Sequence, residues 1–256
     1  LFNIEGEKME KDLQEIKKHW EKEETISLRD LNLQLLEREV IINFIKKSDK
    51  SILKDIGCGD GSDTVHFSKY VDQVYAYDYS SAMVDKASDN LGSIDTVYLG
   101  RLDIINDKIE QMSDLVITKR MLINLGSFEN QKIAIKKIYD SLEKNGYFIM
   151  LETSIDGLIN LNSYRSEFGL DIIPEPFHNT LFKLDELKLF LEEYFVIEDI
   201  KYFSTYFFLT RVYNFLLESK NPYKYDIFAK SVAERNIALF GSEIIGPQFC
   251  MLLRKK

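Results

Sequence analysis

The chain has 256 residues, of which 45% are hydrophobic and 29% charged, and its formal net charge is −9. This length and composition suit one globular domain with a packed core, and the acidic balance argues against a nucleic-acid partner, which requires a basic face. No segment reaches the roughly 18 apolar residues of a membrane span, and Cys58 and Cys250 form neither a disulfide framework nor a zinc motif. We therefore expect a cytoplasmic protein, a monomer or homodimer, without a metal.

Two helices are predicted in residues 1–50. Residues 8–24 are dense in Lys and Glu, which is typical of a solvated helix. Trp20 in this segment either closes over a ligand or is a surface aromatic. Residues 27–47 carry an apolar stripe that we expect to pack on a sheet: Leu31, Leu35, Leu36, Val40, Ile41, Phe44 and Ile45.

A doubly wound, Rossmann-like α/β sheet of seven strands is predicted for the rest of the chain. Strand-like runs alternate with helical patterns, which is typical of a parallel sheet with crossover helices. One of these helices is expected over residues 128–144, with Ser127 as its N-cap and Asn145-Gly146 as its end. The predicted strands are residues 52–56, 74–78, 96–99, 114–118, 147–152, 195–203 and 248–254.

Three parts of this domain are expected to differ in role. Residues 1–50 supply a lid helix and a sheet-packing helix, residues 51–152 a cofactor-binding core, and residues 153–256 the acceptor side with the last two strands. Two segments, 153–194 and 204–247, fall outside the minimal alternation and should cover the carboxyl edge of the sheet, where such sheets bind ligands. The aromatic stretch 202–209 is interpreted as core or oligomer interface, with an acceptor lid as the alternative.

Three glycines mark the segment Asp-Ile-Gly-Cys-Gly-Asp-Gly at residues 55–61. It follows a predicted strand and precedes a helix expected near Ser62, so the glycines lie where the backbone must turn sharply and approach a ligand. Seventeen residues after Gly61 the next strand ends in Asp78, which is placed to accept both hydroxyls of a ribose. The glycines alone could form a simple tight turn, but with Asp78 they predict an adenosine-containing cofactor.

A nicotinamide dinucleotide is the alternative ligand for such a turn, and it would make the protein an oxidoreductase. The dinucleotide fingerprint G-x-G-x-x-G requires a third glycine where this chain has Ser62. Asp55 and Asp60 would also repel a diphosphate, whereas Asp55 suits a cationic amino group.

Residues 55–61, Asp78 and Leu102-Asp103-Ile104 together resemble the class I S-adenosylmethionine-dependent methyltransferases, over residues 52–152. The resemblance implies S-adenosylmethionine as cofactor, with its methionine part on the glycine turn, its ribose on Asp78 and its adenine beside Asp103 and Ile104. Asp103 could instead only cap a turn, and Cys58 could be a small filler. The implied cofactor-binding residues are Asp55, Gly57, Cys58, Gly59, Gly61, Asp78, Tyr79, Met83, Asp103, Ile104 and Thr118.

A second resemblance covers the acceptor half of the chain. Residues 118–125, with Gln131, Glu152, Asn162, Arg165, His178 and Asn179, are similar to methyltransferases encoded among surface-polysaccharide (capsule or lipopolysaccharide) genes. The catalytic candidates are His178 as general base, Arg120 and Glu152. The candidates for binding the acceptor are Arg120, Asn124, Asn162, Arg165, Asn179 and Arg211.

Each charged candidate also has a structural interpretation. Lys119 and Arg120 could be exposed loop charges, Arg165 and Arg211 could form salt bridges, and a lone His178 could be structural. The functional interpretation is O-methylation of a small anionic acceptor, such as a phosphorylated or nucleotide-linked sugar. A non-catalytic binding protein on the same fold is the remaining alternative.

Overall fold

A computed structural model describes residues 12–22, 30–217, 227–235 and 243–256. Its sheet has seven strands, as predicted, and their order is β3-β2-β1-β4-β5-β7-β6. β7 runs antiparallel to both of its neighbours, and the other neighbouring pairs are parallel. The strands are β1 (Ile52–Ile56), β2 (Gln73–Asp78), β3 (Val97–Arg101), β4 (Ser113–Lys119), β5 (Leu142–Thr153), β6 (Phe195–Tyr202) and β7 (Gln248–Lys255).

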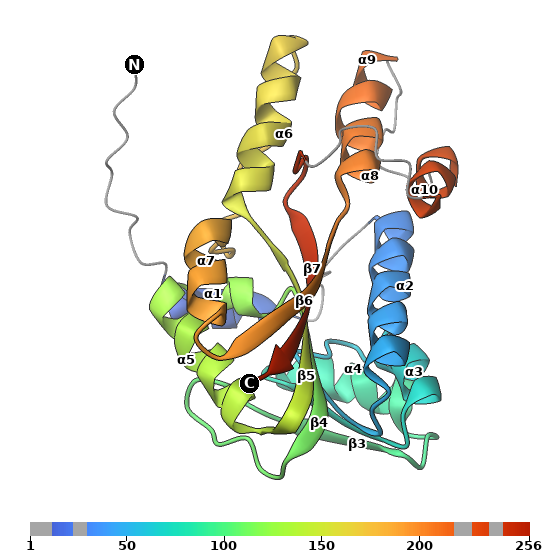
Figure 1. Ribbon diagram of the computed structural model, residues 1–256, viewed down its shortest axis with the longest axis vertical. Helices are drawn as coiled ribbons and strands as arrows, with labels where there is room; N and C mark the ends of the chain where they lie inside the picture. Colours follow the sequence, from blue (N-terminus) through green and yellow to red (C-terminus); the bar gives the residue numbers. More distant parts are fainter. Residues whose placement is uncertain (1–11, 23–29, 218–226, 236–242) are drawn as a thin grey trace.

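Helices cover both faces of the sheet (Figure 1). α2 (Leu31–Ser48), α3 (Thr64–Phe67) and α4 (Ser81–Leu91) pack on one face, while α5 (Phe128–Asp140) and α7 (Leu184–Leu191) pack on the other. The central strands are therefore buried on both sides, which explains continuous apolar runs such as residues 115–117. Short helical turns complete these layers at η1 (Ser68–Tyr70) and η2 (Leu122–Asn124).

Residues 155–167 and 204–216, from the two segments outside the minimal alternation, form helices that extend beyond one end of the sheet (Figure 1). Residues 153–194 contribute α6 (Ile155–Glu167) and α7. Residues 204–247 contribute α8 (Ser204–Phe208), the π-helical turn η3 (Leu209–Tyr213), α9 (Asn214–Leu216) and α10 (Ile227–Glu234), and residues 218–226 and 236–242 lie outside the described residues. Within the described residues, no helix is long and apolar enough to cross a membrane.

Polar caps define several helix starts. Asp30, Ser80, Ser127 and Ser154 each accept a hydrogen bond from the backbone amide three residues further on. The prediction of Ser127 as an N-cap is thus confirmed.

The predicted end of the following helix is wrong. α5 ends at Asp140, because Ser141 turns back to the last carbonyls and Leu142 already pairs with Ser113. Asn145, at φ +59°, turns the chain within β5 next to a register shift, so the Asn-Gly signal marks a turn in a strand.

The two predicted N-terminal helices are each found in the part that the structure describes. α1 spans Leu13–Trp20 and α2 spans Leu31–Ser48, while residues 8–11, 23–24 and 27–29 of the predicted helices lie outside the described residues. Leu31 and Leu35 are 46% and 43% exposed, because they project from the side of α2 opposite the fully buried Leu33. The prediction that these two leucines pack on the sheet was therefore wrong.

Candidate active site

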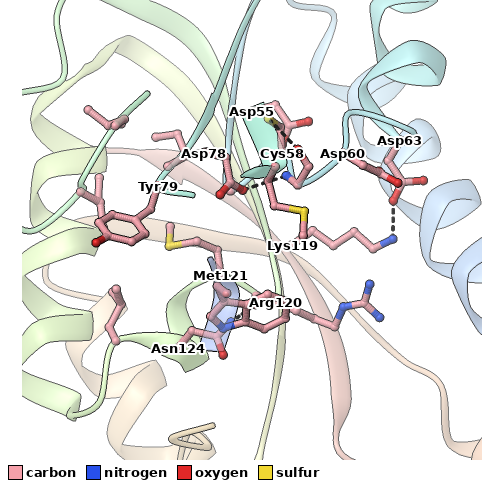
Figure 2. Close-up of a pocket in the computed structure, with 18 of the residues that line it drawn as sticks. Asp55, Cys58, Asp60, Asp63, Asp78, Tyr79, Lys119, Arg120, Met121 and Asn124 are labelled. Atoms are coloured by element: carbon pink, nitrogen blue, oxygen red, sulfur yellow. Dashed lines mark hydrogen bonds and ion pairs between the residues drawn. The ribbon is translucent and has the colours of Figure 1, made fainter. Parts of the chain in front are cut away.

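A cavity of about 470 Å³ opens at the carboxyl ends of β1, β2 and β4. Its volume falls in the range of roughly 300–1,000 Å³ typical of small-molecule sites. Tyr79 lies at one end of the cavity, and Asp63 with Lys119 lies at the other (Figure 2). Residues from several parts of the chain line it, including Leu13, Ile16, Lys17 and Trp20 of α1, Gly57, Cys58 and Gly59 after β1, Asp78 and Tyr79 at the end of β2, Leu102, Asp103 and Ile104 after β3, and Lys119, Arg120, Met121 and Asn124 at the end of β4.

The glycine turn has the geometry that its sequence predicts. Gly57 and Gly59 have φ values of +83° and +58°, which favour glycine. A Cβ on Gly57 would lie only 2.6 Å from Met121 Cβ, so the turn and the segment after β4 are in close contact. Any larger residue at position 57 would push these two walls of the cavity apart.

Asp78 is oriented by the backbone around it. Its Oδ2 accepts the Gly59 amide at 2.8 Å and its Oδ1 accepts the Ser80 amide at 2.9 Å. Burial raises the pKa of Asp78, and these amide bonds oppose that shift by favouring the charged form. The carboxylate is therefore held in place while its remaining lone pairs stay available for a ribose diol.

Asp55 is a buried acid beneath the glycine turn. It is 3% exposed, and Thr64 Oγ1 donates to its Oδ2 at 2.6 Å. Burial raises the pKa of Asp55 to about 7, and the charges of Asp63 and Asp78 add to that effect. A cationic amino group near Asp55 would favour its ionised form.

Helix α1 closes the cavity on the adenosine side. Lys17 Nζ lies 2.6 Å from Asp103 Oδ2 and 4.6 Å from the centre of the Tyr79 ring. Burial opposes ionisation of Asp103, but hydrogen bonds from Lys17 and Asn106 lower its pKa below the usual value. Ser80 Oγ also donates to the Trp20 carbonyl at 3.0 Å. These contacts make α1 a wall of the cofactor site, so Lys17 is a site residue that the sequence interpretation missed.

An ion cluster lies at the opposite end. Lys119 Nζ contacts Asp63 Oδ2 at 2.5 Å and Glu37 Oε2 at 3.2 Å, and Arg120 Nη1 lies 3.2 Å from the same Glu37 oxygen. Arg38 pairs with Asp63 at 2.5 Å. Within this cluster three cations meet two carboxylates, which gives the cluster one excess positive charge, while Asp55, Asp60 and Asp78 are further acids in the lining of the cavity. Lys119 and Arg120 are therefore only 8% and 10% exposed and are not free loop charges.

Two polar atoms near this cluster have no hydrogen-bond partner among the described residues. They are Arg120 Nε and Asn124 Oδ1, both buried, on side chains that line the cavity. Asn124 uses its amide nitrogen to hold the Arg120 carbonyl at 2.7 Å. An unpaired donor and an unpaired acceptor on two lining side chains fit a ligand that offers both an oxyanion and a hydroxyl.

Four residues that we predicted to bind the cofactor or to take part in catalysis do not line the cavity. Gly61 packs against Leu91 of α4, and Thr118 is fully buried within β4. Glu152, also fully buried, accepts three backbone amides behind the wall. His178 is not among the residues that line the cavity. Its ring stacks on His19, with ring centroids 4.6 Å apart, and contacts the Trp20 ring edge-on at 5.7 Å.

Four acceptor candidates also lie outside the residues that line the cavity. The Asn162 side chain bonds the backbone of Ile173, and the backbone amide of Asn179 donates to the Pro176 carbonyl. Arg165 donates to the carbonyls of Asp171 and Arg211, and it stacks on Phe215. Arg211 pairs with buried Asp30 at 2.8 Å. The salt-bridge interpretation therefore describes Arg211, and we do not propose these four side chains as acceptor ligands.

Cys58 lines the cavity without the features of a reactive thiol. Burial and the neighbouring carboxylates raise its pKa, whereas a nucleophilic cysteine needs a lowered one. Its place between two glycines fits the small-filler interpretation. In the described part of the chain, no group of His, Cys, Asp or Glu side chains could hold a metal ion.

Comparisons with known proteins agree with this geometry. A family described as "Methyltransferase domain" matches residues 54–150. A search of curated protein sequences finds no match to the chain. Among solved structures, the chain is similar to the N-methyltransferase NodS from Bradyrhizobium japonicum WM9 in complex with S-adenosylhomocysteine, with a TM-score of 0.60 at 12% identity over 95% of this chain and 97% of that one.

A second similar structure is the magnesium protoporphyrin IX methyltransferase ChlM from Synechocystis PCC 6803 with bound S-adenosylhomocysteine. It has a TM-score of 0.58 at 12% identity and covers 95% of this chain and 94% of that one. At such identities these likenesses establish the fold.

Residues 54–150 match a methyltransferase domain, and the fold around them is that of the class I methyltransferases. The protein is an enzyme that uses S-adenosylmethionine as its cofactor, with the glycine turn and Asp78 at the expected strand ends. This identification replaces the oxidoreductase and the non-catalytic protein that the sequence left as alternatives.

Proposed function

We propose that the enzyme transfers the methyl group to a hydroxyl oxygen of a small anionic acceptor, of the class of phosphorylated or nucleotide-linked sugars used in surface-glycan biosynthesis. The observation that carries this proposal is the pair of unpartnered atoms at one end of the cavity, Arg120 Nε and Asn124 Oδ1. They supply one donor for an oxyanion and one acceptor for a hydroxyl proton.

The electrostatics of the ion cluster support an anion at this end. Arg120 meets Glu37 only through Nη1, at 3.2–3.3 Å, which leaves the edge of the guanidinium formed by Nε and Nη2 for a second oxyanion. The excess positive charge of the cluster favours such a group. Because the cluster is mostly buried, its interaction with a ligand charge is screened less than it would be at an exposed surface.

Positioning should dominate catalysis. The bound cofactor supplies a methyl group on a positively charged sulfur, which is already a good electrophile. Asn124 Oδ1 would orient the acceptor hydroxyl, Arg120 would hold its anionic part, and α1 would exclude water. Orienting two reactants is worth an effective molarity of up to about 10⁵–10⁸ M, whereas a general base typically adds about 10²–10⁴-fold.

A panel of acceptors tests the proposal. Purified enzyme is incubated with S-adenosylmethionine and with phosphorylated sugars, nucleotide-linked sugars, neutral sugars or amines, and S-adenosylhomocysteine formation is measured. We expect turnover with anionic sugars to exceed that with matched neutral sugars at least about tenfold, since a charged hydrogen bond contributes about 1.5–3 kcal/mol. Equal turnover with neutral sugars, or activity restricted to amines, would contradict it.

A further inference from the structure

Glu152 lies at the end of β5, directly behind the segment that carries the acceptor-side residues. Its side chain is fully buried, and the described residues place no cation against it. Oε1 accepts the amides of Met121 and Leu122 at 3.3 and 3.1 Å, and Oε2 accepts the amide of Ile123 at 3.3 Å. One carboxylate therefore binds three consecutive amides at the start of η2.

The segment that Glu152 holds needs external support. Arg120 has φ +54°, a conformation that costs about 1–3 kcal/mol for a residue other than glycine and persists only where the surroundings enforce it. The Arg120 amide bonds the Leu151 carbonyl at 2.8 Å, so both ends of this turn are tied to the end of β5. Met121 in turn presses against Gly57 of the cofactor turn.

We infer that Glu152 is a positioning residue for methyl transfer. Its carboxylate fixes residues 120–124 so that Arg120 and Asn124 face the acceptor while Met121 contacts the glycine turn. The inference rests on the proposed function only for the identity of the acceptor. Burial raises the pKa of Glu152 to about 7, while the three amide bonds favour its ionised form, in which each bond is charge-assisted and about twice as strong as a neutral one.

Glu152→Gln, compared with Thr153→Val, tests the role. The glutamine has the same shape but turns an NH₂ group toward amide donors. Thr153 is the matched control, because it is the next residue of β5, it is buried, and its hydroxyl has no partner among the described residues. Three quantities are measured for each variant: hydrogen exchange of the peptide covering residues 118–126, affinity for S-adenosylhomocysteine, and kcat with KM for an acceptor from the panel.

For Glu152→Gln we expect exchange at residues 121–123 to rise at least about tenfold and kcat to fall by about 10–100-fold, while cofactor affinity changes less than threefold. Thr153→Val should match the wild type in all three. Unchanged exchange or unchanged kcat in Glu152→Gln would overturn the inference. If Glu152→Gln does not fold, Glu152→Asp decides by the same measurements, because its shorter side chain cannot reach all three amides.

Failure of the proposed function would look different. It would appear as a wild type that is inactive with every anionic sugar, or as an activity that does not depend on Arg120. The exchange measurement needs no acceptor. Even if the proposed acceptor is wrong, hydrogen exchange at residues 121–123 that is as slow in Glu152→Gln as in the wild type would overturn the positioning role.

Discussion

The backbone amide of Gly59 donates to Asp78 Oδ2 across 2.8 Å, which ties the glycine turn after β1 to the carboxylate that ends β2. The glycine turn and Asp78, which lie nineteen positions apart in sequence, are therefore already hydrogen-bonded to each other without a cofactor. Asp78 orients the turn with one oxygen and begins α4 through Ser80 with the other. We propose that the ribose of the cofactor binds here, at a carboxylate that the protein itself already orients.

Asp78→Ala should weaken S-adenosylhomocysteine binding by at least about tenfold, because both the ribose contact and the anchor of the glycine turn are lost. Asp78→Asn should lose less, since its amide oxygen can still accept from Gly59. Calorimetric titration measures both affinities, with Asp89→Ala on the exposed side of α4 as the control. An Asp78→Ala affinity equal to that of the control would remove Asp78 from the cofactor site.

Arg120→Ala should raise the KM for an anionic acceptor by about 10–100-fold and leave cofactor affinity within threefold, because the charged contact that we assign to Arg120 lies at the acceptor end. Steady-state kinetics with a phosphorylated sugar and with its unphosphorylated form check this. The effect should vanish with the neutral sugar. An equal KM for both enzymes with the charged acceptor would return Arg120 to a structural role.

Arg211→Met should destabilise the protein by about 3 kcal/mol without changing the KM for the acceptor. Its partner Asp30 is 4% exposed and would be left as a buried carboxylate, bonded only to Tyr206 and to a backbone amide. Urea unfolding gives the stability change. A stable variant with a raised KM would instead support the original assignment of Arg211 to acceptor binding.

Asp55 should make stability fall as the pH rises. Burial raises its pKa to about 7, whereas an unfolded aspartate titrates near about 3.9. Between these values the native state keeps a proton that the unfolded state has released, so the free energy of unfolding decreases with pH, by at most about 1.4 kcal/mol per pH unit. Asp55→Asn should remove this slope in urea titrations from pH 4 to about 7. Identical slopes in both proteins would show that Asp55 is already ionised when buried.

His178 should act through its ring contacts. Because it stacks on His19 of α1, we expect His178→Ala to weaken cofactor affinity about 2–10-fold, the value of one aromatic pair, and His178→Phe to retain turnover. Comparing kcat for the two variants separates a packing role from that of a general base, because phenylalanine keeps the ring contact but cannot accept a proton. Inactivity of both variants with intact cofactor binding would restore His178 as the base.

The fold and the cofactor half of the site could be predicted because their signals are local. The strand at residues 52–56, the glycine turn that follows it and Asp78 at the end of the next strand can each be recognised from a short stretch of sequence. The adenine-side residues Asp103 and Ile104 follow the same rule, and the structure brings all of them to one cavity.

The acceptor half could not be predicted in the same way, because its contacts join distant segments. Glu37 is central to the ion cluster, yet it lies on the buried face of α2, one helical turn from the apolar residues Leu33 and Ile41. Its charge on that face was the one signal available. Arg165 and Arg211 looked like ligands only because their partners, the carbonyl of Asp171 and the buried carboxylate of Asp30, cannot be recognised without the fold. Lys17 contacts Asp103 across 86 positions of sequence and gave no local signal.

Calorimetric titration of the purified protein with S-adenosylhomocysteine tests the central claim most directly, with NAD as the comparison ligand. We predict saturable binding of one S-adenosylhomocysteine per chain and no detectable heat with NAD. Saturable binding of NAD without binding of S-adenosylhomocysteine would contradict the assignment of the glycine turn and Asp78 to the cofactor of a methyltransferase.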